Sequence, residues 1–271
     1  MRAVLVVMVA LGCYAPHPLT GGRCAEGDTC PEGLVCSPAS QTCERTAVDA
    51  HVDVIHDGAA TAHDAPGDAA TTAMLVQSAT SYASPSTSLG VTLPSVPAAG
   101  HLLVLIAGNP HAPLTSVTGA GATWTLAASS SVYANVEIWL GVTDGSSATL
   151  TATDPGSTAP MSMLLTEWSG LAATATLDGA AALDGVTSPA SPGAITTTNA
   201  RDLLVFAISD PFPNTFGAPA PGSWSALPEL DHAVSQAAWY RTVDTAGTFA
   251  PEVSETAHTW DAALVGLRIA P

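Results

Sequence analysis

The sequence lacks lysine and has few charged or aromatic residues. Of its 271 residues 11% are charged and 5% are aromatic, and all six basic residues are arginine. The formal net charge of −17 repels phosphate backbones, which argues against binding to nucleic acid. Without lysine the chain also cannot form a phosphate-binding loop of the GxxxxGK[ST] type. The surface must therefore consist largely of Ser, Thr, Gly, Pro and Ala.

Motifs of the common enzyme classes are absent as well. The sequence contains no GxSxG, HExxH or GxGxxG motif. A glycosidase needs two carboxylates, and Glu137 and Glu167 lie on expected strands. The second half of the chain has Ala237 and Leu267 in their places. We therefore expect both glutamates to face solvent, and we expect no catalytic residues and no enzyme activity.

No apolar run reaches the length of about 20 residues that a membrane-spanning helix needs. The chain begins instead with Met-Arg and a short apolar segment, which is typical of an export signal over residues 1–12. A cysteine, Cys13, follows directly. It is either a lipid attachment site or an ordinary cysteine of a secreted protein.

The four residues ALGC at 10–13 resemble the lipobox of bacterial lipoproteins. This resemblance implies cleavage between Gly12 and Cys13, acylation of Cys13 and membrane anchoring through the lipid. Ala10 departs from the family pattern, which usually has leucine at that place. The expected location is the outer membrane or cell surface, because the residue after the cysteine, Tyr14, is not the aspartate that retains some lipoproteins on the inner membrane.

All five cysteines lie within the first 43 residues. If Cys13 carries lipid, four remain in the segment 24–43, CAEGDTCPEGLVCSPASQTC, which is too short to build a core and so needs two disulfides. Of the three connectivities we favour the interlaced one. It pairs Cys24 with Cys36 and Cys30 with Cys43.

Zinc is the alternative for these cysteines, but zinc sites usually space them as C-x2-4-C, and the spacings here are longer. The stretch CPEGLVC at 30–36 resembles the small CPxGxxC modules near the N-termini of bacterial surface lipoproteins, which are loosely EGF-like. Residues 44–73, rich in Ala, Asp and His, have too few bulky apolar side chains to fold and are expected to form a disordered linker. Metal binding by DAHVDVIHD at 49–57 is the alternative for this linker.

From residue 74 onward the chain consists of short apolar or alternating runs separated by turn residues, which predicts an all-β domain over 74–271. The expected strands are 101–108, 122–129, 135–143, 148–153, 161–168, 202–209, 236–243 and 262–269. The joining segment LDGAAALDGVTSPASPG at 177–193 is expected to be rich in turns.

The domain contains an internal repeat at an offset of about 100 residues. The offset matches Trp124 with Trp224, Trp139 with Trp239 and Leu164 with Leu264. We therefore predict two repeats, 74–171 and 172–271, which form a jelly-roll-like β-sandwich. Either each repeat is a small sandwich, or the two interlock as a single one, and we favour the single sandwich.

Most of the region 74–271 resembles β-sandwich modules of secreted bacterial proteins. The shared elements are DLLV (202–205), SW (223–224), WYRTVDTAGTFAP (239–251) and TWDAALVGLR (259–268). The resemblance implies an exported jelly-roll-like module, sometimes attached to carbohydrate-active or adhesive proteins, and it implies no catalytic residues.

The function expected from these observations is non-catalytic binding of glycan or of a surface protein. A polysaccharide hydrolase or its accessory module, and a purely structural envelope protein, are the alternatives. Trp168 and Trp260, which have no tryptophan at the matching position of the other repeat, are the candidate ligand-binding residues. No cofactor or metal is expected, apart from calcium at three loop aspartates as an alternative to simple turns. These are Asp144, Asp154 and Asp244.

Overall fold

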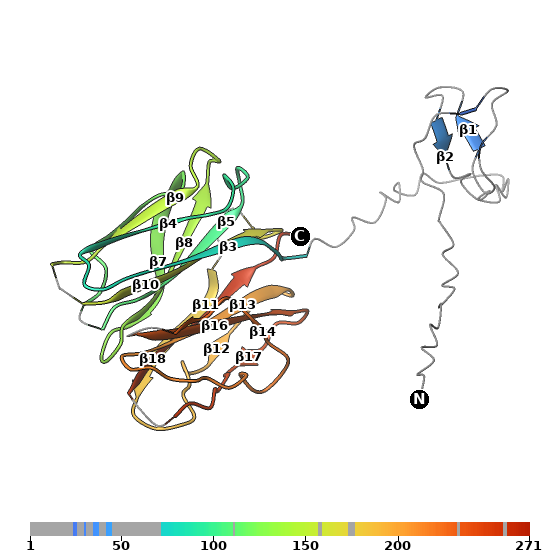
Figure 1. Ribbon diagram of the computed structural model, residues 1–271. Helices are drawn as coiled ribbons and strands as arrows, with labels where there is room; N and C mark the ends of the chain where they lie inside the picture. The colour runs from blue at the N-terminus through green and yellow to red at the C-terminus, as the bar shows by residue number, and fades with distance from the viewer. Residues whose placement is uncertain are drawn as a thin grey trace, which may run out of the picture. The chain divides into compact units, whose positions relative to one another are not determined.

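The computed structural model divides the chain into two units, Met1–Asp64 and Ala65–Pro271 (Figure 1). The described residues contain no helix that could span a membrane. The residues described are Cys24, Ala25, Cys30, 35–37, 42–44, 72–110, 112–156, 159–172, 177–231, 234–256 and 259–271. The predicted signal segment, Gly12, Cys13 and almost the whole predicted linker lie outside them.

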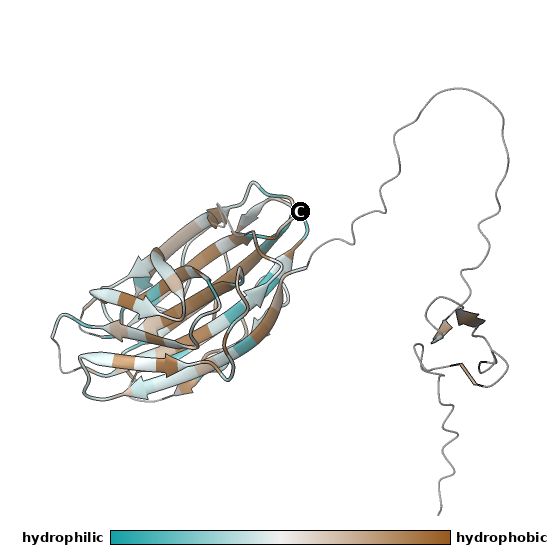
Figure 2. Cartoon of the chain, turned by 90° about the horizontal axis from the view of Figure 1, so that it is seen from above, coloured by the Kyte–Doolittle hydropathy of each residue, from teal (hydrophilic) through white to brown (hydrophobic). Residues whose placement is uncertain are grey.

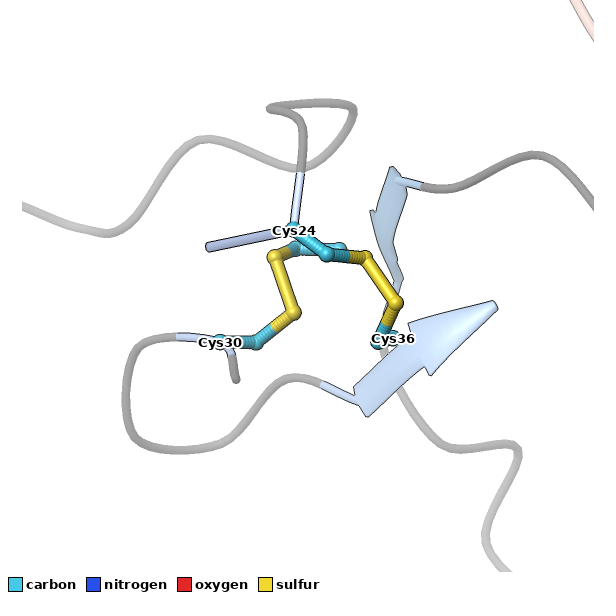
Figure 3. The surroundings of a disulfide bond; sticks show 4 residues. Cys24, Cys30 and Cys36 are labelled. Carbon is cyan, nitrogen blue, oxygen red and sulfur yellow. A yellow bond between two sulfur atoms is a disulfide. The ribbon is translucent and has the colours of Figure 1, made fainter. Parts of the chain in front are cut away.

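The first unit contains a hairpin of two short antiparallel strands, β1 (Val35–Ser37) and β2 (Thr42–Glu44). Cys36 and Cys43 lie opposite each other on these strands but bond to different partners. The disulfides are Cys24–Cys36 and Cys30–Cys43, with Cα–Cα distances of 5.8 and 5.7 Å (Figure 3). The predicted interlaced pairing is confirmed, and it ties both strands to the segment that precedes them.

The second unit is all-β, as predicted, and its first repeat forms two antiparallel sheets. The larger sheet has the order β3-β10-β5-β8-β7 and the smaller one the order β4-β9-β6. In chain order these strands are β3 (Met74–Ala83), β4 (Ser88–Thr92), β5 (Leu102–Gly108), β6 (Ser116–Gly119), β7 (Ala122–Ser130), β8 (Val136–Thr143), β9 (Thr149–Thr153) and β10 (Met161–Ser169).

The second repeat has the same plan. Its larger sheet has the order β11-β18-β13-β16-β14, with β15 also paired to β16, and its smaller sheet joins β12 to β17. The strands are β11 (Leu177–Gly185), β12 (Ile195–Thr196), β13 (Asp202–Asp210), β14 (Ser225–Ala226), β15 (Leu230–Asp231), β16 (Ser235–Val243), β17 (Thr248–Phe249) and β18 (Trp260–Arg268). In both repeats the first strand pairs with the last, and the last with the third, which is a jelly-roll order.

The register gives a residue-by-residue match between the repeats. In the first repeat, Trp139 on β8 and Leu165 on β10 pair with the same residue of β5, which lies between them. In the second repeat, Trp239 on β16 and Leu264 on β18 pair with the same residue of β13. Leu264 therefore corresponds to Leu165, and the match with Leu164 that the sequence comparison gives is wrong by one residue. The duplication itself is confirmed, because the strand order and these rows agree.

Three apolar cores separate the sheets. One core lies between the two sheets of the first repeat and another between the two sheets of the second. The third lies between the two larger sheets, and in it Trp168 packs edge-on against Tyr240 at 4.9 Å between ring centroids. The second unit is thus built of four layers of sheet. Figure 2 shows that the hydrophobic residues of this unit lie mainly on its strands.

The preference for one interlocked sandwich is therefore wrong, because every strand ladder in the second unit joins strands of the same repeat. Between the repeats, the described backbone has an isolated bridge from Leu171 to Ile269. The continuous apolar strands explain the packing. Strands β5 and β13 are buried along their full length, so each needs a layer on both faces.

The joining segment also differs from expectation, since residues 177–185 form strand β11 rather than turns. This strand consists mostly of Ala, Gly and Asp, which have low strand propensity, but it pairs with β18 at the edge of the larger sheet. Tertiary pairing overrides the weak local preference here. The eight strands expected from the sequence are confirmed to within two residues at each end.

Candidate functional site

The two glutamates considered for catalysis are buried, so the expectation that they face solvent is wrong. Glu137 on β8 is 0% exposed. One of its carboxylate oxygens accepts hydrogen bonds from the Leu114 amide at 2.7 Å and from the Asn135 side chain at 2.9 Å. The other accepts from the indole N–H of Trp139 at 2.6 Å. Glu137 therefore fixes the loop before β6 and the start of β8.

Glu167 on β10 has the same kind of environment at the other end of the sheet. Its Oε1 accepts from the Ala98 amide at 2.9 Å and from Nδ1 of His101 at 2.6 Å, and its Oε2 accepts from the Gln77 side chain at 2.5 Å. Burial on its own raises the pKa of Glu167, but these hydrogen bonds outweigh burial and hold the pKa below its usual value. The register matches Glu167 with Gly266 rather than with Leu267.

The second repeat anchors the equivalent loop with a different acid. Asp178, at the bulge in β11, accepts from the backbone amides of Thr198 and Asn199 at 2.6 and 2.7 Å and from Arg268 at 2.7 Å. Burial raises the pKa of Asp178, but these hydrogen bonds dominate and hold it far below its usual value. Burial, together with the nearby Asp178 carboxylate, raises the pKa of the buried Asp202.

Asp261 on β18 accepts five hydrogen bonds from the other repeat. This side chain of the second repeat is 0% exposed and reaches into the β7–β8 turn of the first. Its oxygens accept from one hydroxyl and four backbone amides, at distances from 2.5 to 3.2 Å. The donors are Ser130, Val132, Tyr133, Ala134 and Asn135. Asp261 therefore holds the turn of one jelly roll against the sheet of the other.

The candidate tryptophans are core residues. Trp168 is 0% exposed and its indole N–H donates to Thr166 at 2.8 Å; Trp260 is 5% exposed and donates to the Thr187 carbonyl at 2.9 Å. Neither indole has a free face on which a sugar ring could stack, so the expectation that they form a ligand-binding surface fails. Strands buried on both faces need large apolar side chains, and these tryptophans supply them.

The three loop aspartates do not form a common site. Asp144 is exposed and accepts from the Ser146 amide at 2.8 Å, and Asp154 accepts from the Gly156 amide at 2.9 Å, as in simple turns. In the described part of the chain, the group of three or more close metal-ligating side chains is Cys24, Cys30 and Cys43. Their sulfurs are already in disulfides, which leaves no thiolate for the zinc alternative.

An open groove lies over β7 and β8 and carries accessible polar groups. It consists of a hollow of about 730 Å³ and an adjoining one of about 370 Å³, which share Thr123, Thr125 and Val142. We call these two hollows the β7–β8 groove. The first also contains Asp144 and the second the apolar side chains of Leu102, Leu140 and Leu177.

A turn with unusual backbone angles forms one end of the β7–β8 groove. Gly119, Ala120 and Gly121 have φ angles of 96°, 53° and 63°. A Cβ atom on Gly121 would collide with the carboxylate of Asp144, so glycine is needed there for this aspartate to lie beside the groove. The groove therefore has one carboxylate, two exposed threonine hydroxyls and an apolar floor, and none of the described arginines lines it.

No family model, no curated protein and no solved structure matches this chain.

Sequence reasoning missed the residues that carry the groove and the contact between the repeats. Thr123 and Thr125 alternate with Trp124 along β7. This alternation predicted the strand, but it gave no reason to choose the two threonine hydroxyls as ligand-binding groups. Asp261 interrupts the apolar run of β18, and a charge inside a strand buried on both faces is a signal that could have been used.

Proposed function

We propose that the second unit is a non-catalytic module that binds a neutral glycan in the β7–β8 groove. The observation that carries this proposal is the lining of the groove. Thr123, Thr125 and Asp144 can pair with sugar hydroxyls, and Val142 and Leu140 offer an apolar floor to the C–H groups of the ring. With one carboxylate and no described arginine at the groove, a uronic acid or sulfated sugar would be repelled.

The hydrolase alternative has less support from the same structure. Glu137 and Glu167 have hydrogen-bond partners on both oxygens and are 0% and 1% exposed, so they cannot reach a glycosidic bond. Binding of a surface protein, and a purely structural role in the envelope, are the outcomes that remain if no glycan binds.

A glycan array with the intact chain, followed by calorimetry on the best ligand, tests the proposal. The double variant Thr123→Val/Thr125→Val keeps the shape of the groove but removes two hydroxyls, and we expect at least a tenfold loss of affinity, or about 1.4 kcal/mol. Thr242→Val is the matched control, because this threonine is exposed on β16 outside the groove. Equal loss in both variants, or binding that selects acidic sugars, would contradict the assignment.

We also propose that the chain is an exported lipoprotein anchored through Cys13 at the outer membrane or cell surface. The support is the lipobox-like ALGC motif together with the disulfides, since Cys24–Cys36 and Cys30–Cys43 use every other cysteine of the sequence. Metabolic labelling with palmitate, compared between the wild type and Cys13→Ala, tests the anchor. Equal labelling of the two proteins would refute it.

A further inference from the structure

A hollow with two arginines lies at the end of the second jelly roll where β13 begins and β18 ends. Its volume is about 420 Å³, and we call it the arginine hollow. Two of the three arginines in the described part of the chain line it, in a protein whose net charge is −17. The lining residues are Ala172, Asn199, Ala200, Arg201, Arg268, Ile269 and Pro271.

The jelly-roll fold does not require these two arginines. The register match between the repeats puts Ser169 at the position of Arg268, and Gly100 at the position of Arg201. The first repeat therefore has the same strand plan without either guanidinium group. The arginine pair is a feature of the second repeat alone, which points to a role other than folding.

Arg268 is held in place with its guanidinium group partly open to solvent. Its Nε and Nη2 donate to one oxygen of Asp178 at 3.1 and 2.7 Å, which fixes the plane of the group. The Arg268 side chain is still 39% exposed, and its Nη1 makes no hydrogen bond to any residue that the structure describes. Arg268 therefore offers an oriented, charged donor to the hollow.

The carboxylates near these arginines lie below the surface of the hollow. The Asp178 side chain is 1% exposed, and Asp202, which follows Arg201, is 0% exposed. A ligand in the hollow would therefore meet guanidinium groups rather than these two carboxylates. Because the buried charges still weaken the positive field, a singly charged group fits better than a phosphate group, which carries about −1.5 to −2 charges at pH 7.

We propose that the arginine hollow binds the carboxylate group of a small organic acid. Guanidinium donors match a planar carboxylate in geometry as well as in charge. The apolar side chains of Ala172 and Ile269 can pack against the carbon chain of such a ligand. The hollow shares no lining residue with the β7–β8 groove, so this proposal does not rest on glycan binding there.

An NMR titration of the intact chain with propionate, at constant ionic strength, tests the proposal. We expect propionate to shift the backbone amide signals of Ala200 and Ile269 and to leave those of Thr123 and Thr125 in the β7–β8 groove unchanged. The neutral analogue propionamide should shift none of the four signals. The proposal would be overturned by unshifted signals at the hollow, by equal shifts with propionamide, or by tighter binding of inorganic phosphate at the same signals.

Substitution of single arginines identifies the groups that hold the carboxylate. Arg201→Gln and Arg268→Gln should each raise the dissociation constant for propionate at least about tenfold, because each removes a charged donor. Arg241→Gln is the matched control, since Arg241 lies on β16 and does not line the hollow. If Arg268→Gln fails to fold because Asp178 loses its partner, Arg201→Gln still decides. Unchanged affinity in Arg201→Gln, or equal weakening in Arg241→Gln, would refute the assignment.

Discussion

Replacement of Asp261 by alanine is the most informative perturbation of the contact between the repeats. The change removes the acceptor of five hydrogen bonds from the β7–β8 turn. The Val132 amide can turn to water, because Val132 is 59% exposed, but Ser130, Ala134 and Asn135 are buried. Three buried donors at roughly 1–3 kcal/mol each, with some relaxation of the turn, give a loss on the order of 3–6 kcal/mol.

The loss should be visible as a lower melting temperature in far-UV circular dichroism. For a domain of about 200 residues, 1 kcal/mol corresponds to roughly 2–4 °C, so we expect a drop of about 6–24 °C. Asp261→Asn should cost less, about 1–2 kcal/mol. Its oxygen can still accept from the three backbone amides of residues 133–135 while its NH₂ group donates to the Ser130 hydroxyl. The change therefore removes the charge and the acceptor of the exposed Val132 amide.

Asp244→Ala is the control for this experiment, since Asp244 is exposed on the loop after β16. It should change the free energy of unfolding by no more than about 0.5 kcal/mol. The reasoning would be refuted if Asp261→Ala melted together with this control, or if Asp261→Asn were as destabilising as Asp261→Ala.

Three further substitutions test the buried polar groups and the central core. Asp202→Asn should raise the melting temperature at pH 7 but not at pH 3. The raised pKa of Asp202 favours the folded state below the ordinary aspartate pKa of 3.8, and this contribution is lost as the pH rises through the folded-state pKa. Glu167→Gln should lower stability at pH 7 by about 1–3 kcal/mol. Since the pKa of Glu167 is lowered, its contribution to stability is present above the ordinary glutamate pKa of 4.5 and fades at lower pH. Acid titration of unfolding should therefore bring variant and wild type together. Trp168→Ala should cost about 3–5 kcal/mol in chemical denaturation, because it leaves a cavity between the larger sheets, and a loss below about 1 kcal/mol would contradict the burial of this side chain.

The sequence predicted the fold better than it predicted the site. Apolar runs such as 101–108 and 202–209 identified strands because burial on both faces selects β-branched and other apolar residues at every position. The cysteine count predicted two disulfides, since a short segment without a core needs cross-links, but it left three connectivities, and the structure has the interlaced one that we favoured. Both signals are local in the chain.

The predictions that failed depend on contacts between residues that lie far apart in the sequence. Asp261 bonds to a turn some 130 positions earlier, and no local pattern in the sequence encodes that pairing. Trp168 was selected as a ligand-binding candidate because the other repeat has no tryptophan at the matching position. The same difference is expected in the core between the two larger sheets, where the indole of one repeat fills space that the other repeat does not need to fill. The one-residue error at Leu264 arose because a fixed offset ignores small changes in loop length between the repeats.

The placement of the disulfides separates the redox chemistry of the two units. Both bridges lie before residue 45, and the sequence has no cysteine beyond Cys43. Thiols or a reducing compartment can therefore dismantle the cross-links of the first unit, while the jelly rolls contain no bond that a reductant can cleave. The second unit can therefore acquire its structure without an oxidant or a disulfide isomerase, and only the disulfides of the first unit depend on oxidation.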